Sequence, residues 1–323
     1  MIIKSQLLRG FFGIQKEILA DLCFALNNLS ILKTAFRSGT NVFKSVASIF
    51  SDEENDKDSE QEEYENFTKN SINWHRTNAL NNFCEILDIK DFNKIDSVRE
   101  LDDICQNIER KAITSQKEIN KKFKGKSIID FQMHNISILE KAFSKMDKNE
   151  KKEIGKEIND HFNKLSKKDK SFSELIKKIK LKFGVKDFNY KSIKKILNNE
   201  DYLKKLLIID DEQGQFIRFI LSELVIDIGK SLVEKTKFYG NMTAASTAVL
   251  FIFTGGLEAL LAGGFTGVFD RFRGKKAKTT ILCYSVFLIS LSSLDNLDPF
   301  DEIKEYIKEH NEAAASGDEE IKF

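Results

Sequence analysis

Residues 242–269, MTAASTAVLFIFTGGLEALLAGGFTGVF, contain a single charged residue, Glu258, among 28. A basic segment, DRFRGKKAKT at 270–279, follows it, and a second apolar run, TILCYSVFLISLSSL, fills 280–294. A helix that is apolar on all sides lies either deep in a protein core or in lipid. The pattern therefore predicts a glycine-rich hydrophobic helical hairpin at 241–294, near the C-terminus, and leaves both surroundings open.

Glycines give this hairpin its expected shape. Gly255 and Gly256 permit a bend between two helical arms, because glycine adopts backbone angles that are closed to other residues. Gly263 and Gly267 form a GxxxG pair, a spacing at which two helices in lipid approach closely. The motif alone does not identify a membrane segment.

A membrane position has one argument for it and one against it. A span needs about 20 largely apolar residues, and 242–269 meets that length. Glu258 opposes permanent insertion, because a carboxylate at mid-bilayer costs about 2.5 to 3.5 kcal/mol. Basic side chains at the end of an inserted hairpin would stay at the lipid headgroups. These residues are Arg271, Arg273, Lys275, Lys276 and Lys278.

The composition narrows the class of protein. Lys and Arg number 51 and Asp and Glu number 50, so the net charge of +1 provides no global field toward nucleic acid or anionic lipid. Pro299 is the only proline in 323 residues. Because proline is frequent in loops and at β-edges, this scarcity predicts long helices joined by short turns and disfavours all-β architectures.

The cysteines and the N-terminus indicate a reducing compartment. The four cysteines lie far apart without a CxxC pair, which supports neither a zinc site nor a disulfide framework. Residues 1–22 lack an uninterrupted apolar region of the kind found in secretory signals. We therefore expect a cytoplasmic protein, with association with the inner membrane as the open alternative.

Composition changes along the chain predict its domain organisation. Residues 1–50 form a basic amphipathic arm, which either lies on a membrane surface or packs on the core. Residues 51–66, SDEENDKDSEQEEYEN, hold nine acids and one lysine and are expected to be a solvated linker. A charged helical domain then fills 67–240, the hairpin 241–294 and an acidic tail 295–323.

Apolar periodicity and helix punctuation place helices within the charged domain. Asp147 and Ser171 each begin a predicted helix, and Gly184 ends the second one. An alternative for IKLKFGVKDFNY, residues 179–190, is a small hairpin that includes a strand. The other predicted helices cover 74–88, 97–121, 128–146, 191–208 and 214–239.

No catalytic motif or metal-binding pattern is recognisable, so the sequence predicts a protein that is not an enzyme and has no cofactor. The four histidines are scattered over separate predicted helices and the tail. Asp102 and Asp103 are adjacent, and neighbours on a helix point about 100° apart, so they are expected to be solvated and not to share an ion. The lysine clusters at 121–126, 164–170 and 176–182 are interpreted as solvated helix faces, and no nucleic acid is expected.

Two stretches resemble the YaaW-like family of uncharacterised bacterial proteins. They are ILEKAFSKMDKNEKKEIGKEI at 138–158 and GGFTGVFDRFRGKKAKTTILCYSVFLISL at 263–291. Thr280 and Ile281 match the family pattern, whereas Leu282 stands where the family has proline. The resemblance implies a bacterial, helical protein with a hydrophobic C-terminal region, and it brings no catalytic residues.

The sequence thus predicts an all-α, multi-helix bundle with two competing functions. In the first, the protein associates with the inner membrane through residues 242–293 as a conditional anchor or pore, with lipid as its partner. In the second, it is a soluble interaction or regulatory protein in which the hairpin is the buried core. A protein partner or self-association then takes the place of lipid.

Overall fold

A computed structural model describes residues 3–27, 65–89, 95–121, 123–145, 147–168, 170–187, 189–208, 275–292 and 299–316, with single positions at 214, 217, 218 and 221. This part of the chain is 81% helical and contains no strand, which confirms the all-α prediction. The helices are α1 (Gln6–Phe11), α2 (Lys16–Asn27), α6 (Ile72–Ile86), α7 (Val98–Ile119), α8 (Ile128–Lys145), α9 (Lys148–Lys168), α10 (Lys170–Phe183), α11 (Tyr190–Leu197), α12 (Glu200–Ile208), α17 (Lys275–Leu291) and α18 (Phe300–Ser316).

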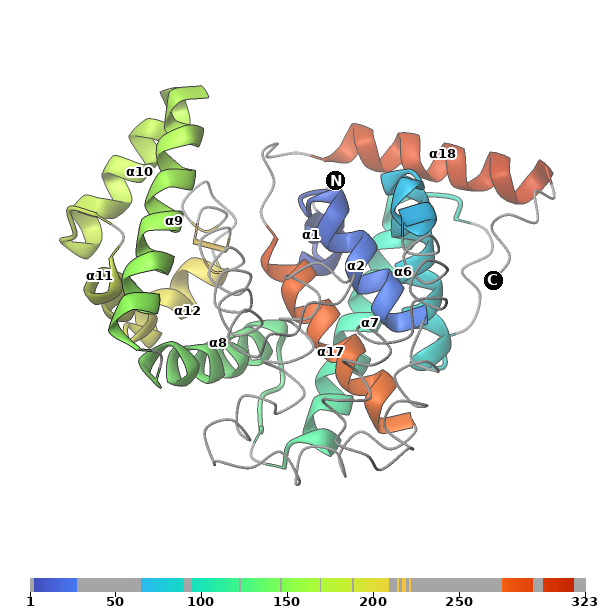
Figure 1. Cartoon of the computed structure of the whole chain (residues 1–323). Coiled ribbons are helices and arrows are strands. Elements are labelled where there is room, and N and C mark those ends of the chain that lie inside the picture. The colour runs from blue at the N-terminus through green and yellow to red at the C-terminus, as the bar shows by residue number, and fades with distance from the viewer. Residues whose placement is uncertain are drawn as a thin grey trace, which may run out of the picture.

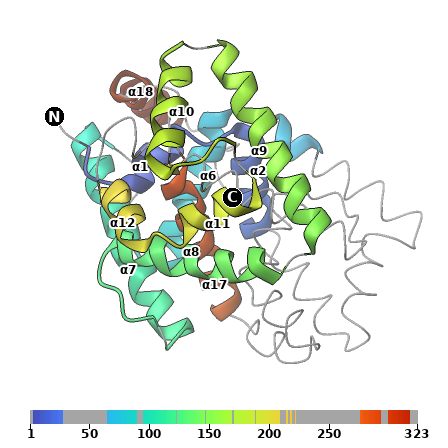
Figure 2. The same cartoon turned by 90° about the vertical axis from the view of Figure 1, so that its left-hand side faces the viewer.

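The described helices form two regions, which are visible side by side in Figure 1. The central bundle consists of α1, α2, α6, α7, α17 and α18, and the lysine-rich lobe consists of α9 to α12. Helix α8 packs against α7 and α17 in the bundle and against α11 and α12 in the lobe. In Figure 2, α8 lies between α11 of the lobe and the lower end of α17 in the bundle, so it connects the two regions.

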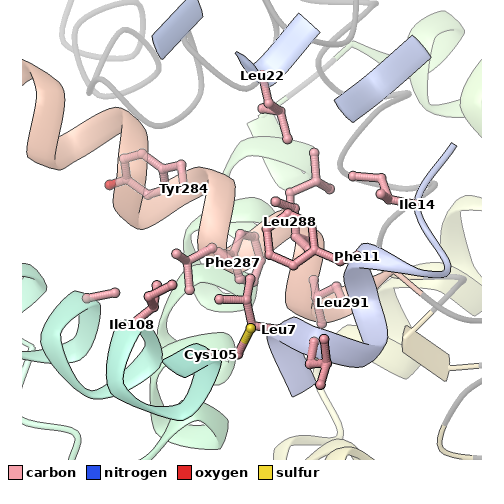
Figure 3. Close-up of a cluster of buried hydrophobic side chains, with 14 of the residues drawn as sticks. Leu7, Phe11, Ile14, Leu22, Cys105, Ile108, Tyr284, Phe287, Leu288 and Leu291 are labelled. Carbon is pink, nitrogen blue, oxygen red and sulfur yellow. The ribbon is translucent and has the colours of Figure 1, made fainter. Parts of the chain in front are cut away.

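Helix α17 lies at the centre of the bundle. Every residue from Ile281 to Leu291 is buried, and the helix packs against α1, α2, α6, α7 and α8. In Figure 3 its side chains Phe287, Leu288 and Leu291 gather with Leu7 and Phe11 of α1. A helix that is buried on every side needs an apolar residue at nearly every position, which explains the second apolar run of the sequence.

Helices α1 and α17 approach each other closely at Gly10. A Cβ added at Gly10 would collide with the backbone carbonyl oxygen of Ile289. Only glycine lets two helix backbones come this near, so Gly10 determines how deeply α1 sits on the central helix.

Polar contacts also join the lobe to the bundle. The side-chain amide of Gln6, on α1, donates to the backbone carbonyl of Leu207 at the end of α12, over 3.0 Å. The Lys204 ammonium of α12 lies 3.2 Å from the Asp130 carboxylate of α8. The lobe is therefore held both by α8 and by the N-terminal helix.

Side chains of the predicted type begin several helices. Ser71 accepts a hydrogen bond from the backbone N–H of Trp74 at 3.1 Å, and Ser97 accepts one from Glu100 at 3.2 Å. Asn189 opens α11 as part of a capping box with Ser192. Such caps satisfy backbone donors that the first turn of a helix leaves free.

The helix predictions for the charged domain are largely confirmed. The segments 74–88, 97–121 and 128–146 correspond to α6, α7 and α8. Asp147 begins α9, with its carboxylate accepting from the backbone N–H of Asn149 at 2.8 Å. Gly184, with a φ of +59°, ends α10.

Two details differ from the predictions. The single helix expected over 191–208 is divided into α11 and α12 at Asn198 and Asn199, because Asn198 caps the end of α11 and the Asn199 carbonyl accepts from Leu203. The alternative strand within 179–190 does not form, since α10 continues to Phe183 and a turn follows. Most of the helix predicted at 214–239 lies outside the described residues.

Candidate functional site

Most residues of the predicted hairpin site lie outside the part of the chain that the structure describes. These residues are Gly255, Gly256, Glu258, Gly263, Gly267, Arg271 and Arg273. Lys275 and Lys276 form the start of α17. The bend and the GxxxG pair therefore stay predictions.

The second apolar run has a described position in the protein core, as part of α17. Of the helices that the structure describes, none is both long enough and apolar enough to cross a bilayer. Helix α17 itself has 17 residues and packs against the surrounding helices. Its role in the bundle is to provide the apolar centre on which the other helices pack.

Two acidic residues of α7, Asp102 and Glu109, bind the N-terminal end of α1. The backbone N–H groups of Lys4 and Ser5 donate to the Asp102 carboxylate at 3.1 and 2.8 Å. Glu109 accepts from the backbone N–H of Leu7 at 2.7 Å and from the Ser5 hydroxyl at 2.9 Å. These contacts satisfy the free donors of the first helical turn and place negative charge at the positive end of the helix dipole.

Opposing effects act on the pKa of the Glu109 carboxyl group. Burial raises its pKa to about 7, because the charged carboxylate loses contact with water. The donors from Leu7, Ser5 and Gln6 lower the pKa in part, and the nearby Asp102 raises it. The proton occupancy of Glu109 therefore changes near neutral pH, inside the core.

Arg76 of α6 binds the opposite end of α1. Its Nε donates to the backbone carbonyl of Phe11 at 2.9 Å, and its guanidinium carbon lies 4.0 Å from the centre of the Phe12 ring. Burial lowers the pKa of Arg76 to about 10, while Glu302 and Glu309 of α18 oppose that shift. The guanidinium stays charged at neutral pH, so α1 has acids at its N-terminus and a cation at its C-terminus.

The burial of Asp102 corrects the sequence interpretation of the Asp102–Asp103 pair. Asp103 is exposed as expected, but Asp102 is only 4% exposed. Asp102 and Glu109 are seven residues apart, which places them on one helix face together with the buried Cys105 and Ala112. The seven-residue spacing of the two acids along the apolar stripe indicates that they face the core. The sequence does not show that their partners are the backbone N–H groups at the start of α1.

The described cysteines do not form a reactive site. Burial raises the pKa of Cys84 to about 11 and raises that of Cys105 and Cys283 as well. The thiols are therefore protonated at neutral pH and weakly nucleophilic. Within the described ranges, no group of three or more His, Cys, Asp or Glu side chains is placed to hold a metal ion.

His75 is the described histidine with the strongest burial effect. The ring centroids of Phe67 and Trp74 lie 5.3 and 5.1 Å from the centroid of its imidazole. Burial, together with the charge of Lys16, lowers its pKa to about 4. The neutral imidazole of His75 packs among aromatic rings in the core, and no described group beside it is placed for acid or base chemistry.

An open hollow of about 440 Å³ lies beside α7. Its charged lining residues are two cations and two acids: Arg99, Arg110, Glu100 and Asp103. Because these charges cancel, the hollow favours neither an anionic nor a cationic ligand.

The outer face of α10 combines lysines with an exposed apolar side chain. Lys177 and Lys178 are exposed, and Leu181, one turn further on, is 84% exposed. The opposite side of the helix carries Ile176, which is buried in the lobe. Glu174 is exposed on the same outer face as the two lysines.

The positive charge continues beyond the end of α10. Lys186, Lys191 and Lys195 are exposed, and a Cβ built at Gly184 would lie 3.3 Å from the Lys195 ammonium. Lys195 thus lies at the C-terminal end of α10, where the helix dipole favours a cation. Residues 164–195 hold twelve lysines and three acids, a net charge of +9 in a chain whose net charge is +1.

Comparison with protein-family models, with curated proteins and with solved structures finds no match. The resemblance to the YaaW-like family stays a hypothesis, and any function must be argued from the residues themselves.

Proposed function

We propose that the protein is a non-enzymatic helical protein that attaches to a membrane through the apolar segment 242–269. One observation carries this proposal. That segment has a single charge in 28 residues and is joined through residues 270–274 to α17, which is fixed in the bundle core. A segment tethered in this way could enter lipid while the bundle stays folded around α17.

The proposal assigns different roles to the two apolar runs. Helix α17 belongs to the protein core, so the membrane contact rests on 242–269 alone. The basic residues between the runs, among them Arg271 and Arg273, would stay at the headgroups and mark the boundary between lipid and bundle.

A second candidate function is that of a soluble interaction or regulatory protein. The observation that favours it is the burial of α17, since one of the two apolar runs does lie in the core. If 242–269 packs in the same way, its glycines would serve close helix packing and not lipid contact. A protein partner would then act on the outer surface.

Deletion of 242–269 alone separates these functions. The variant replaces 242–269 by a short Gly/Ser linker and keeps residues 275–292, because loss of α17 would remove the bundle core. Membrane attachment predicts that the full chain remains with membranes after carbonate extraction, whereas the variant is extracted and stays helical by circular dichroism. The core alternative predicts a full chain that is extracted and a variant that unfolds.

A further inference from the structure

Exposed lysines lie on the outer face of α10, in the turn that follows it and at the start of α11. Lys177, Lys178, Lys186 and Lys191 are exposed, and among the residues that the structure describes their side chains have no ion pair or hydrogen bond. We call this surface, with Leu181, the α10 lysine face. Mutual repulsion among these lysines would be relieved by a partner of opposite charge.

We propose that the α10 lysine face binds the anionic headgroups of a membrane. The inference rests on the proposed membrane function, because it names the surface that meets the lipid and the class of lipid that it selects. Its main support is that Lys177, Lys178 and the exposed Leu181 share one face of α10, with Lys186 and Lys191 exposed beyond the end of the helix.

The apolar member of the face distinguishes lipid from a purely ionic partner. Leu181 is 84% exposed and lies between Lys177 and Lys178 in helical projection, on the side opposite the buried Ile176. On a membrane surface such a leucine enters the acyl boundary while the lysines contact the headgroups. Against a nucleic-acid backbone the leucine would have no comparable partner.

The chemistry of the cations agrees with a diffuse anionic surface. All twelve cations in 164–195 are lysines, which act as flexible point charges, whereas arginine suits fixed, two-pronged contacts to a single phosphate. Each lysine near an anionic surface increases partitioning about fivefold at moderate salt. Glu174 lies on the same face and opposes the attraction, so its replacement offers a test in the opposite direction.

The test uses the full chain and four exposed lysines. The variant K177Q/K178Q/K186Q/K191Q is compared with the charge-matched control K121Q/K124Q/K304Q/K308Q, whose lysines are also exposed but lie outside the lobe. Binding is measured by co-sedimentation with vesicles of phosphatidylcholine alone and of phosphatidylcholine with one quarter phosphatidylglycerol. Circular dichroism checks that every variant is folded.

We expect the full chain to bind the phosphatidylglycerol vesicles more strongly than the phosphatidylcholine vesicles, and 0.5 M salt to remove this difference. The face variant is expected to bind the phosphatidylglycerol vesicles at least about 50-fold less than the original chain. Binding of the control variant is expected to fall by no more than about fivefold. Leu181→Gln should weaken binding several-fold, and Glu174→Gln should strengthen it. Equal losses in the face variant and in the control would overturn the proposal, as would unchanged binding of the face variant.

Two further outcomes separate this inference from the proposed function. Carbonate-resistant attachment that does not depend on the four lysines overturns the inference and leaves the function of 242–269 intact. Salt-sensitive, lysine-dependent binding that carbonate removes supports the inference and contradicts stable insertion. Lysine-dependent binding of a 30-nucleotide single-stranded RNA without binding to phosphatidylglycerol vesicles would assign the face to nucleic acid and overturn the lipid proposal.

Discussion

The central bundle and the lysine-rich lobe differ in where their charged and apolar side chains lie. In the bundle, α17 is buried on every side, and the charged groups that enter the core, Asp102, Glu109 and Arg76, bind the two ends of α1. In the lobe, each described helix buries one stripe and leaves lysines facing solvent. The bundle therefore buries its charged groups in contacts that hold α1, whereas the lobe leaves its lysines exposed to solvent.

The largest test of this contrast compares two apolar side chains. Phe287 of α17 is fully buried, and Phe287→Ala should lower the free energy of unfolding by about 3 to 5 kcal/mol through loss of packing and cavity formation. Leu181→Ala in the lobe should change it by less than about 0.5 kcal/mol, because Leu181 is 84% exposed. Urea denaturation measures both, and similar losses would contradict the division into two regions.

The next test probes the contact between α1 and α17. Gly10→Ala should lower the free energy of unfolding by about 2 to 3 kcal/mol, because the new Cβ meets the rigid carbonyl oxygen of Ile289 and not a movable side chain. The thermal midpoint should fall accordingly. A variant as stable as the original would show that α1 does not sit on α17 at this depth.

A third test uses pH to examine the buried acid. The folded-state pKa of Glu109, about 7, lies above its ordinary value of 4.5, so the protonated form favours the folded state. Its contribution to stability is therefore fully present below pH 4.5 and is lost as pH rises through 7. Across this window the loss is on the order of 2 to 3 kcal/mol.

Glu109→Gln should remove that dependence, because glutamine does not ionise and its oxygen can still accept from Leu7 and Ser5. The measurement is the difference in unfolding free energy between the original chain and the variant at pH 5 and at pH 8. His75 titrates in the opposite sense, losing stability as pH falls from 6.5 through about 4, and it cancels in that difference. The same difference at both pH values would contradict the burial of a titrating Glu109.

The smallest expected effects concern the ends of two helices. Asp88 follows α6 with a φ of +51°, and Gly184 follows α10 with a φ of +59°. Asp88→Gly should raise the free energy of unfolding by about 0.5 to 1 kcal/mol, and Gly184→Ala should lower it by about 1 kcal/mol, because only glycine adopts this conformation without strain. The two substitutions should shift the denaturant midpoint in opposite directions. Shifts in the same direction would contradict the left-handed conformation at one of these positions.

Much of the helical framework is predictable from the sequence, because helix starts and apolar spacing are local signals. Asp147 and Gly184, predicted as a helix start and a helix end, have these positions in the structure, and Ser171, the other predicted start, is the second residue of α10. The break at Asn198 and Asn199 was missed, since the apolar spacing continues across it. Local patterns therefore place helices better than they divide them.

The binding of α1 by distant charges could not be predicted. Asp102 and Arg76 bind α1 from positions about 98 and 65 residues away along the chain, and helical periodicity carries no information on such partners. The same limit applies to the apolar runs, because a helix that is apolar on all sides has one pattern for core and for lipid. Only the tertiary position of α17 assigns the second run to the core.

The most direct test of the central claim is carbonate extraction of membranes that carry either the full chain or the variant with 242–269 replaced by a Gly/Ser linker. We expect the full chain to resist extraction, and the variant to be extracted while its helical content and its cooperative unfolding remain. A full chain that is extracted completely, together with a variant that has lost cooperative unfolding, would contradict the account and assign 242–269 to the protein core.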